Sequence, residues 1–304
     1  MKELDLSIVI VNHNAEEFLE QSLKSIYENT QEINFEIIVV DNNSADESTK
    51  MVKEKFPQVK LIEKVNNEGF TKAANQGTKE SRARFILYLN NDTVVLSRAL
   101  EEMVKFMDNY PQAGACGAKI LNSDGTLQFS CRQFPTYLSA LFNRSSLLTR
   151  LFPNNIFSKR YLMSDWSHDE VRQVDWVSGS CLIIRRQAMD EVGLMDDGYF
   201  IYCEDVDWCY RASQAGWKIY YVHQSQIIHL SGWPLNPLRM VFEHHRSMYR
   251  FYRKHYSRSR FIDCIVLTGI VIRLGTILAY KSLGQLLPKS STAKQDFKGV
   301  KKAV

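Results

Sequence analysis

The chain has 304 residues, of which 45% are hydrophobic and 24% charged, and its mean hydropathy is −0.27. This balance excludes a disordered chain, and the length allows one large core or a core domain with an appendage. From residue 238 onward there are 14 Lys and Arg against 3 Asp and Glu, net +11, whereas residues 1–237 carry a net charge of −7. This asymmetry argues against nucleic acid as a partner of the whole chain and favours an anionic membrane surface beneath its C-terminal part.

Cysteine usage and the first residues indicate the compartment. The six cysteines form no CxxC pair and no metal-binding spacing with histidine. The chain enters the apolar run "LDLSIVIVN" without the features of a secretory signal. We therefore expect a reduced, cytoplasmic protein.

The first 90 residues alternate between apolar runs and segments of helical spacing. Nearly continuous runs of Val, Ile and Leu predict strands covered on both faces, and Phe18, Leu19, Leu23 and Ile26 illustrate the helical spacing. The predicted strands are 6–12, 35–41, 59–64 and 84–90, and the predicted helices are 15–29, 45–55 and 69–82. This βαβαβαβ order predicts an α/β fold with a doubly wound, mostly parallel sheet.

The pattern changes after residue 97. It predicts a helix over 97–109, a strand over 114–120, a turn at 122–125 with a further strand, and two strand-like runs, "WKIYYV" and "QIIHLSG". Residues 134–172 are aromatic and irregular. They are interpreted either as a lid or acceptor-shaping insertion or as a satellite apolar cluster.

Polar side chains follow several predicted strands, where doubly wound sheets bind ligands. Asp92 follows the strand "FILYL", and a single aspartate beside asparagines suits Mg²⁺ or Mn²⁺ held mainly by a diphosphate, or alternatively an Asx turn. Asp41 ends the second strand and is placed to accept hydrogen bonds from a nucleobase or ribose. Ser44 or Asp46 is then expected to cap the next helix.

A third group of carboxylates lies in "GYFIYCEDVDWCYRASQAGW", residues 198–217. Glu204, Asp205 and Asp207 stand among aromatic residues, where a carboxylate needs a partner or a chemical task. The segment continues with helical spacing to Gly216, so the first acids would lie at a helix N-terminus. Asp207 and Arg211 are four residues apart and are expected to pair along this helix, which gives Asp207 a structural role.

Seven motifs follow one another over about the first 232 residues: "SIVIVNHN", "VVDNNSAD", "NEGFTKAANQG", "LNNDT", "VSGSCLIIRR", "YCEDVDWCYR" and "IIHLSG". In this order they resemble the motifs of the family 2 glycosyltransferases of the GT-A fold, most closely bacterial rhamnosyltransferase-like enzymes of cell-surface polysaccharide assembly.

The resemblance implies a donor site with a divalent ion, Mn²⁺ or Mg²⁺. Asp92 and His229 would bind the metal, although His229 could instead be a hydrogen-bonded core group. The family's DxD motif reads Asn90-Asn91-Asp92 here, which puts the metal charge on one carboxylate. Gly69 would let the backbone approach the donor, or would form an ordinary turn before a helix. The nucleotide-sugar-binding residues implied are Asn12, Asp41, Asn67, Gly69, Asn75, Asn90 and Asn91.

The resemblance also implies an acceptor site. Asp205 would take the proton from the acceptor hydroxyl, a step for which a positioned base contributes about 10²- to 10⁴-fold. Glu204, Trp176, Gly179 and Ser180 would contact the acceptor, although Trp176 could equally belong to the core.

The expected organisation is a GT-A catalytic domain over 1–237, with a nucleotide-sugar half (1–96) and an acceptor half (97–237). A basic and apolar helical region (238–288) and a disordered basic tail (289–304) would follow. Asp263 and Arg273 interrupt the apolar segment, so an interfacial anchor on the inner leaflet is preferred over a membrane span. A helical hairpin packed on the catalytic domain or on a dimer partner is the alternative.

The function expected is inverting, metal-dependent transfer of a sugar, with rhamnose as the first guess, from a dTDP- or UDP-sugar to a glycan or lipid-linked acceptor. The enzyme would be peripheral at the inner face of the cytoplasmic membrane. A sugar nucleotidyltransferase is one alternative, but "VNHNAEEF" lacks the glycine-rich basic loop that such an enzyme would have after its first strand. A non-catalytic sugar-binding scaffold is the other, and a G-x-G-x-x-G dehydrogenase is disfavoured.

Overall fold

The computed structural model describes residues 4–136, 156–230 and 237–286. The chain divides into two compact units, residues 1–233 and residues 234–304. The expected disordered tail lies outside the described residues, as does most of the first half of the aromatic insertion.

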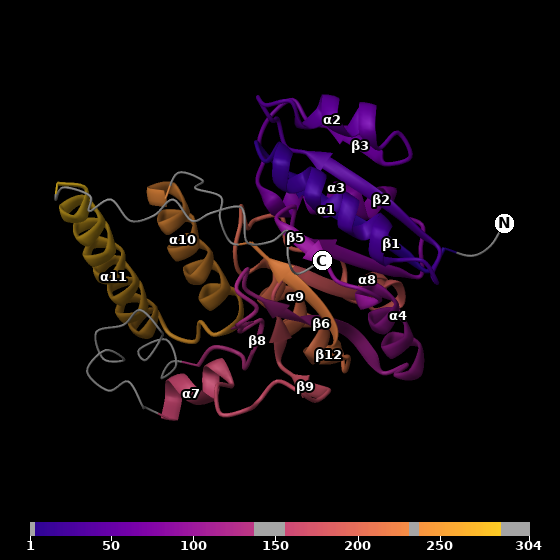
Figure 1. Cartoon of the computed structure of the whole chain (residues 1–304). Coiled ribbons are helices and arrows are strands. Elements are labelled where there is room, and N and C mark those ends of the chain that lie inside the picture. Colours follow the sequence, from indigo (N-terminus) through magenta and orange to yellow (C-terminus); the bar gives the residue numbers. More distant parts are fainter. Residues whose placement is uncertain (1–3, 137–155, 231–236, 287–304) are drawn as a thin grey trace. The chain divides into compact units, whose positions relative to one another are not determined.

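The first unit is built on a mixed sheet with the strand order β3-β2-β1-β4-β11-β6-β12-β5 (Figure 1). Its first half follows the predicted alternation. The elements are β1 (Leu6–Asn12), α1 (Glu16–Asn29), β2 (Phe35–Asp41), α2 (Ser48–Lys55), β3 (Lys60–Glu63), α3 (Phe70–Glu80) and β4 (Phe85–Leu89).

These four strands are parallel, and both of their faces are covered. In β2, Ile37 and Val39 belong to a large core with side chains of α1 and α2. The alternate side chains Ile38 and Val40 pack with Ala73 of α3 on the other face. This two-sided burial confirms the doubly wound architecture and explains why the strand sequences are almost continuously apolar.

The second half reverses some strand directions. β11 (Cys181–Arg185) is antiparallel to β4 and to β6 (Ala113–Leu121). The two predicted strand-like runs form one strand, β12 (Lys218–His229), whose register against β6 shifts between Val222 and Gln226. The other elements of this half are β5 (Thr93–Val95), α4 (Ala99–Asn109), β7 (Leu127–Gln128), β8 (Cys131–Arg132), α7 (Ile156–Leu162), β9 (Arg172–Val174), β10 (Trp176–Val177), α8 (Arg186–Val192) and α9 (Glu204–Gln214).

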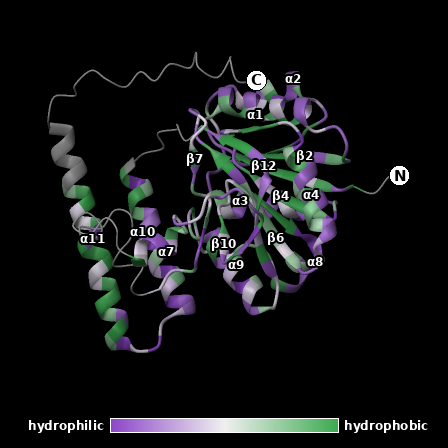
Figure 2. Cartoon of the chain, turned by 60° about the horizontal axis from the view of Figure 1, so that its bottom comes forward, coloured by the Kyte–Doolittle hydropathy of each residue, from purple (hydrophilic) through white to green (hydrophobic). Residues whose placement is uncertain are grey.

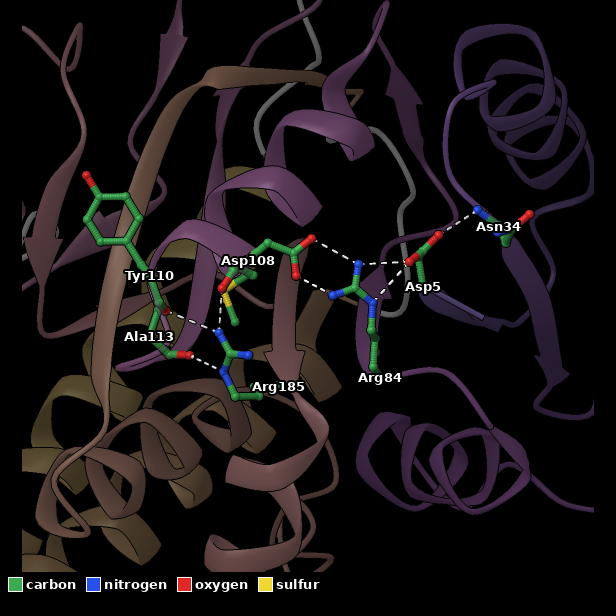
Figure 3. Close-up of polar contacts among 8 residues, drawn as sticks. Asp5, Asn34, Arg84, Asp108, Tyr110, Ala113 and Arg185 are labelled. Carbon is green, nitrogen blue, oxygen red and sulfur yellow. Dashed lines mark hydrogen bonds and ion pairs between the residues drawn. The ribbon is translucent and has the colours of Figure 1, made fainter. Parts of the chain in front are cut away.

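A polar brace joins the sheet at the edge opposite the carboxyl ends of β1 and β4 (Figure 3). Arg84 donates two hydrogen bonds, of 3.0 and 2.8 Å, to Oδ1 of Asp5 and also pairs with Asp108 at the end of α4. The backbone N–H of Asn34 donates to the other oxygen of Asp5. Arg185 donates to the Ala113 carbonyl at 2.9 Å. These contacts tie together the starts of β1, β4 and β6 and the end of β11 at this edge of the sheet.

The second unit contains two helices side by side, α10 (Pro237–His255) and α11 (Arg260–Leu286) (Figure 1). Asp263, in the first turn of α11, accepts hydrogen bonds from Tyr252 at 2.8 Å and Ser257 at 2.9 Å and pairs with Arg253. These bonds explain how a carboxylate is accommodated in a largely apolar helix.

The residues Arg260–Ala279 are long and apolar enough to cross a membrane, and only 6% of that stretch is buried. Figure 2 shows much of α11 in the green of hydrophobic residues. Large exposed side chains on this helix are Phe261, Ile265, Leu267, Val271 and Ile272.

Candidate active site

Three strand ends meet at the carboxyl edge of the parallel strands. Asn12 ends β1 directly opposite Asp41 at the end of β2, and Nδ2 of Asn12 donates to Oδ1 of Asp41 at 3.0 Å. Asn91, which follows β4, donates to Oδ1 of Asn12 at 2.8 Å. The structure therefore brings together three residues that the family resemblance assigned to the nucleotide-sugar.

The carboxylate of Asp41 accepts hydrogen bonds within its own turn. Ser44 donates to it through its backbone N–H at 2.8 Å and through its hydroxyl at 2.5 Å. The prediction was that Ser44 or Asp46 caps the next helix, and Ser44 is not that cap, because its N–H and its hydroxyl both donate to Asp41. Asp46 contacts the start of α2, where the Ser48 N–H donates to Oδ1 at 3.2 Å.

The Asn67–Gly69 turn is tied to the end of β2 by Asn42, which donates to Oδ1 of Asn67 at 2.9 Å and to the Gly69 carbonyl at 3.1 Å. Gly69 has a φ of +92°, and a Cβ there would lie 2.5 Å from the carbonyl oxygen of Phe200. The first N–H of α3, from Phe70, donates to the same oxygen at 2.7 Å. The glycine therefore permits close approach of the loop that precedes α9.

Asn75 lies apart from this group. It sits on α3, is buried, and donates to the Met195 carbonyl at 2.7 Å. Its side chain thus holds the loop that leads to α9, away from the strand-end asparagines.

Asp92 and His229 form a compact pair. Nε2 of His229 lies 3.1 Å from Oδ1 of Asp92, and each side chain is 14% exposed. Nδ1 of His229 lies 2.7 Å from Oε1 of Gln128, a carbonyl acceptor, which places the ring proton on Nδ1. Nε2 faces Asn90, whose amide lies at 3.3 Å, and Asp92.

This pair fits a divalent ion. An imidazole nitrogen and a carboxylate oxygen this close can share a cation, and both are ligands that Mn²⁺ accepts. Adjacent ligands of an octahedral ion with bonds of about 2.1 Å lie about 3.0 Å apart, close to the spacing of these two atoms. Among the residues that the structure describes, no group of three or more His, Cys, Asp or Glu side chains surrounds a common point.

The Asp92–His229 pair is connected to Asp205, the predicted base, through the loop before β11. The Asn90 N–H donates to the Ser180 carbonyl at 3.1 Å, and its side chain lies 3.4 Å from the Ser180 hydroxyl. The adjacent N–H, of Gly179, donates to Oδ2 of Asp205 at 2.9 Å. Asn90, two residues before Asp92, is thus connected to the Asp205 carboxylate through Ser180 and Gly179, which are consecutive residues of this loop.

Asp205 and Glu204 begin α9, after Tyr202 and Cys203, which both have positive φ angles. The Val206 N–H donates to Oδ1 of Asp205 at 2.8 Å. Burial raises the pKa of Asp205, although the amides of Gly179 and Val206 and the charge of Arg132 offset this. Burial, together with the neighbouring Asp205, raises the pKa of Glu204 to about 8.

Asp207 is a structural residue. It is fully buried, it accepts from Nε of Arg211 at 2.9 Å, and Tyr199 donates to its other oxygen at 3.2 Å. Arg211 also donates to the carbonyls of Val192 and Leu194 at the end of α8. The predicted pairing of Asp207 with Arg211 is confirmed.

Two residues near the site carried no clear signal in the sequence. Gln128 belongs to the short strand β7, and Arg132 belongs to β8, so each lies in an element of two residues.

Trp176 is 8% exposed and donates from Nε1 to the Gln133 carbonyl at 2.9 Å. The guanidinium of Arg132 lies 5.3 Å from the Trp176 ring centroid.

The family model for glycosyl transferase family 2 matches residues 7–193. The chain is 28% identical over 265 residues to the N-acetylglucosaminyl-diphospho-decaprenol L-rhamnosyltransferase of Mycobacterium tuberculosis, covering 83% of this chain and 85% of that protein. It is 26% identical over 231 residues to the rhamnosyltransferase WbbL of Escherichia coli, covering 73% and 82%.

Solved structures share the fold at low sequence identity. The mannosyltransferase PcManGT from Pyrobaculum calidifontis, in complex with GDP-Man and Mn²⁺, has a TM-score of 0.58 at 13% identity over 95% of this chain and 82% of that chain. The S. aureus TarS fragment in complex with UDP has a TM-score of 0.52 at 14% identity over 88% and 71%. The chain therefore belongs to glycosyl transferase family 2 and is a glycosyltransferase with the GT-A fold.

Proposed function

We propose that this enzyme transfers a sugar, with inversion at the anomeric carbon, from a nucleotide diphosphate to a hydroxyl of a glycan or lipid-linked acceptor in cell-surface polysaccharide synthesis. The observation that carries the proposal is the path from Asp92 to Asp205 through Asn90, Ser180 and Gly179. Because two relatives are rhamnosyltransferases, rhamnose is the sugar proposed, with a dTDP-sugar as first candidate donor and a UDP-sugar as second.

Asp205 is the proposed general base. Its two oxygens are oriented by the N–H groups of Gly179 and Val206, which fix the carboxylate without a full counter-charge. The acceptor hydroxyl gives its proton to Asp205 while its oxygen bonds to the anomeric carbon, and the bond from that carbon to the diphosphate breaks on the opposite side. The nucleoside diphosphate leaves with the bonding electron pair.

Asp92 and His229 are the proposed metal ligands, with Gln128 holding the imidazole orientation. A bound Mn²⁺ or Mg²⁺ would act as a Lewis acid and stabilise charge on the leaving diphosphate. Asn12, Asp41 and Asn91 form the proposed nucleotide side. Asn67 and Gly69 shape the neighbouring turn, and Asn75 holds the loop that leads to α9.

The α10–α11 hairpin is proposed to bind the inner leaflet of the cytoplasmic membrane. The exposed apolar side chains of α11 begin directly after a basic turn, and this combination matches an anionic lipid surface. Dimerisation through the same helices is the competing use of this surface. The basic residues at the turn are Arg253, Lys254, Arg258 and Arg260.

A screen of nucleotide sugars tests the proposed function. We expect a dTDP- or UDP-sugar to raise the melting temperature with Mn²⁺ present and to be hydrolysed slowly without an acceptor. Stabilisation without hydrolysis or transfer would instead support a binding scaffold. Release of diphosphate from a nucleoside triphosphate and a sugar 1-phosphate would support the nucleotidyltransferase alternative.

A further inference from the structure

The α8–α9 loop, residues 193–203, leads into the helix that carries the proposed base, and its start is bound to that helix. Nη1 of Arg211 donates to the Val192 carbonyl at 2.7 Å, and Nη2 donates to the Leu194 carbonyl at 2.8 Å. Nε1 of Trp208, a fully buried side chain, donates to the carbonyl between these two at 2.9 Å. The first residues of the loop are therefore held against α9.

The same loop is bound to α3 at two points. Nδ2 of Asn75 donates to the Met195 carbonyl at 2.7 Å, and the Phe70 N–H donates to the Phe200 carbonyl at 2.7 Å. The second contact depends on Gly69, because a Cβ at that position would lie 2.5 Å from the Phe200 oxygen. α3 begins directly after this glycine, on the proposed nucleotide side of the site. The loop therefore connects α3 with α9.

The end of the loop has a backbone conformation that requires support from its surroundings. Tyr202 and Cys203, the two residues before α9, have φ angles of +70° and +66°. This left-handed region costs free energy for residues with a Cβ, so it persists only where neighbouring contacts hold it. Because Asp205 is the second residue of α9, the position of its carboxylate depends on this turn.

The carboxylate of Asp205 is oriented by N–H groups from two different elements. Val206 belongs to α9 and would move with Asp205, whereas Gly179 belongs to the loop before β11. The 2.9 Å hydrogen bond from Gly179 to Oδ2 is therefore made only while α9 keeps its place relative to that loop. A displacement of the α8–α9 loop would break this bond first.

Asn75 has two possible uses that differ in their kinetic consequences. Its amide orientation is fixed, because only Nδ2 can donate to the Met195 carbonyl. Oδ1 of Asn75 has no hydrogen-bond partner among the described residues. The family resemblance assigns Asn75 to the nucleotide-sugar, and a donor hydroxyl at Oδ1 would be that use. The hydrogen bond to the α8–α9 loop gives it the other use, which acts on Asp205.

Resting on the proposed function, we propose that Asn75 is a positioning residue for the base: through the α8–α9 loop it holds α9 where the carboxylate of Asp205 meets the acceptor hydroxyl. The loop thereby joins the start of α3, on the nucleotide side, to the residue that takes the proton. Misplacement of a reacting group by about 1 Å can lower a rate about 100-fold, so an anchor that touches no substrate can control turnover.

Asn75→Ala tests this with the donor that the nucleotide-sugar screen identifies, dTDP-rhamnose being the first choice. The turnover number should fall roughly 10- to 100-fold, because α9 loses an anchor. The dissociation constant of the donor, measured by calorimetry with Mn²⁺, should not change. Asn75→Ser keeps a hydroxyl donor on a shorter side chain, should lose less turnover than Asn75→Ala, and serves if the alanine variant does not fold.

Thr78→Val is the matched control on the same helix. Thr78 lies one turn after Asn75, is also buried, and its hydroxyl lies 2.6 Å from that of Tyr88 in β4. The substitution therefore removes a buried hydrogen bond of α3, but not one that reaches the α8–α9 loop. It should lower the melting temperature, as Asn75→Ala does, and leave the turnover number unchanged.

A double substitution determines whether Asn75 acts through Asp205. In the Asp205→Asn background, Asn75→Ala should cause little further loss of turnover, because the carboxylate that it positions is gone. Weaker donor binding with unchanged turnover would place Asn75 against the donor and overturn the proposal. So would an equal loss of turnover in Thr78→Val, or losses that simply multiply in the double variant. Failure of the proposed function would differ from all of these, as no turnover of any nucleotide sugar by the wild-type enzyme.

Discussion

Nε2 of His229 lies 3.1 Å from Oδ1 of Asp92 because β12 and β5 pair in antiparallel fashion. His229 is the last residue of β12 and lies opposite Thr93, and Asp92 immediately precedes Thr93. The Leu230 N–H also donates to the Asp92 carbonyl at 2.9 Å. The sheet itself therefore sets the spacing of the two proposed metal ligands.

Gln128→Ala should weaken Mn²⁺ affinity roughly 10- to 100-fold, the usual effect of removing a residue that orients a metal-binding histidine. The cause is loss of the 2.7 Å contact that fixes the ring proton on Nδ1 of His229. Titration of Mn²⁺ against the enzyme, followed by electron paramagnetic resonance of the unbound ion, measures this directly. Gln173→Ala, at an exposed glutamine of β9, is the control, and equal affinities of all three proteins would remove Gln128 from the metal site.

The sequence predicted the donor half of the fold well, because strands buried on both faces and amphipathic helices leave strong periodic signals. It also predicted that polar residues would gather at the ends of β1, β2 and β4. It could not predict Gln128 or Arg132, because each lies in a strand of only two residues. Their positions depend on pairing with β6 and β10, which no local pattern encodes.

The lack of a continuous local pattern also explains why β12 was predicted as two separate strand-like runs. A strand that bulges between Val222 and Gln226 breaks its own alternation, so the sequence presents it as two runs. The role suggested for Gly69 illustrates a different limit. The family resemblance implied that Gly69 lets the backbone approach the donor, whereas in the structure the carbonyl of Phe200 is the group that lies against this glycine.

Glu204→Gln should become more stable relative to the wild type as pH rises from about 5 to 8. Burial raises the pKa of Glu204 to about 8, above its ordinary value of 4.5. Between these values the folded protein keeps a proton that the unfolded chain has lost, so the contribution of Glu204 to stability falls as pH rises. Glutamine does not ionise and removes this slope.

Thermal unfolding of both proteins across that pH range checks this prediction. Glu17→Gln, at an exposed glutamate of α1, is the control and should show no such divergence. Parallel curves for wild type and Glu204→Gln would mean that Glu204 is ionised in the folded protein.

Arg84→Met should lower the free energy of unfolding at pH 7 by about 1–3 kcal/mol, because it leaves the carboxylates of Asp5 and Asp108 without their shared donor. Burial acts to raise the pKa of Asp5, but hydrogen bonds from Asn34 and Arg84 outweigh burial and lower this pKa in the folded protein. The contribution of Asp5 is therefore complete above its unfolded pKa of 3.8 and is lost as pH falls through the folded value.

Urea unfolding at pH 7 and near pH 3 measures the effect of Arg84→Met. The difference from wild type should shrink at the lower pH, and Lys105→Met, at an exposed lysine of α4, should cost little at either pH. A cost that does not depend on pH would instead assign the role of Arg84 to packing on Phe85, because the guanidinium lies 4.8 Å from the Phe85 ring centroid.

The α10–α11 hairpin should bind vesicles that contain phosphatidylglycerol more strongly than vesicles of phosphatidylcholine, and salt should weaken this binding. Ile272→Ser and Phe261→Ser, at side chains 64% and 74% exposed, should each weaken sedimentation with vesicles about tenfold or more. Val65→Ser is the matched control because Val65 is 86% exposed in the first unit. Unchanged vesicle binding, with concentration-dependent dimers lost in the α11 variants, would assign the surface to self-association.

The most direct test is the behaviour of Asp205→Asn with the donor that the screen identifies, measured as Mn²⁺-dependent donor binding by calorimetry and as sugar transfer. We expect donor affinity within about twofold of wild type and a rate of transfer lower by about 10²- to 10⁴-fold. In parallel, Asp92→Ala should lose the Mn²⁺-dependent part of donor binding. Transfer by Asp205→Asn at the wild-type rate would contradict the assignment of Asp205 as the base.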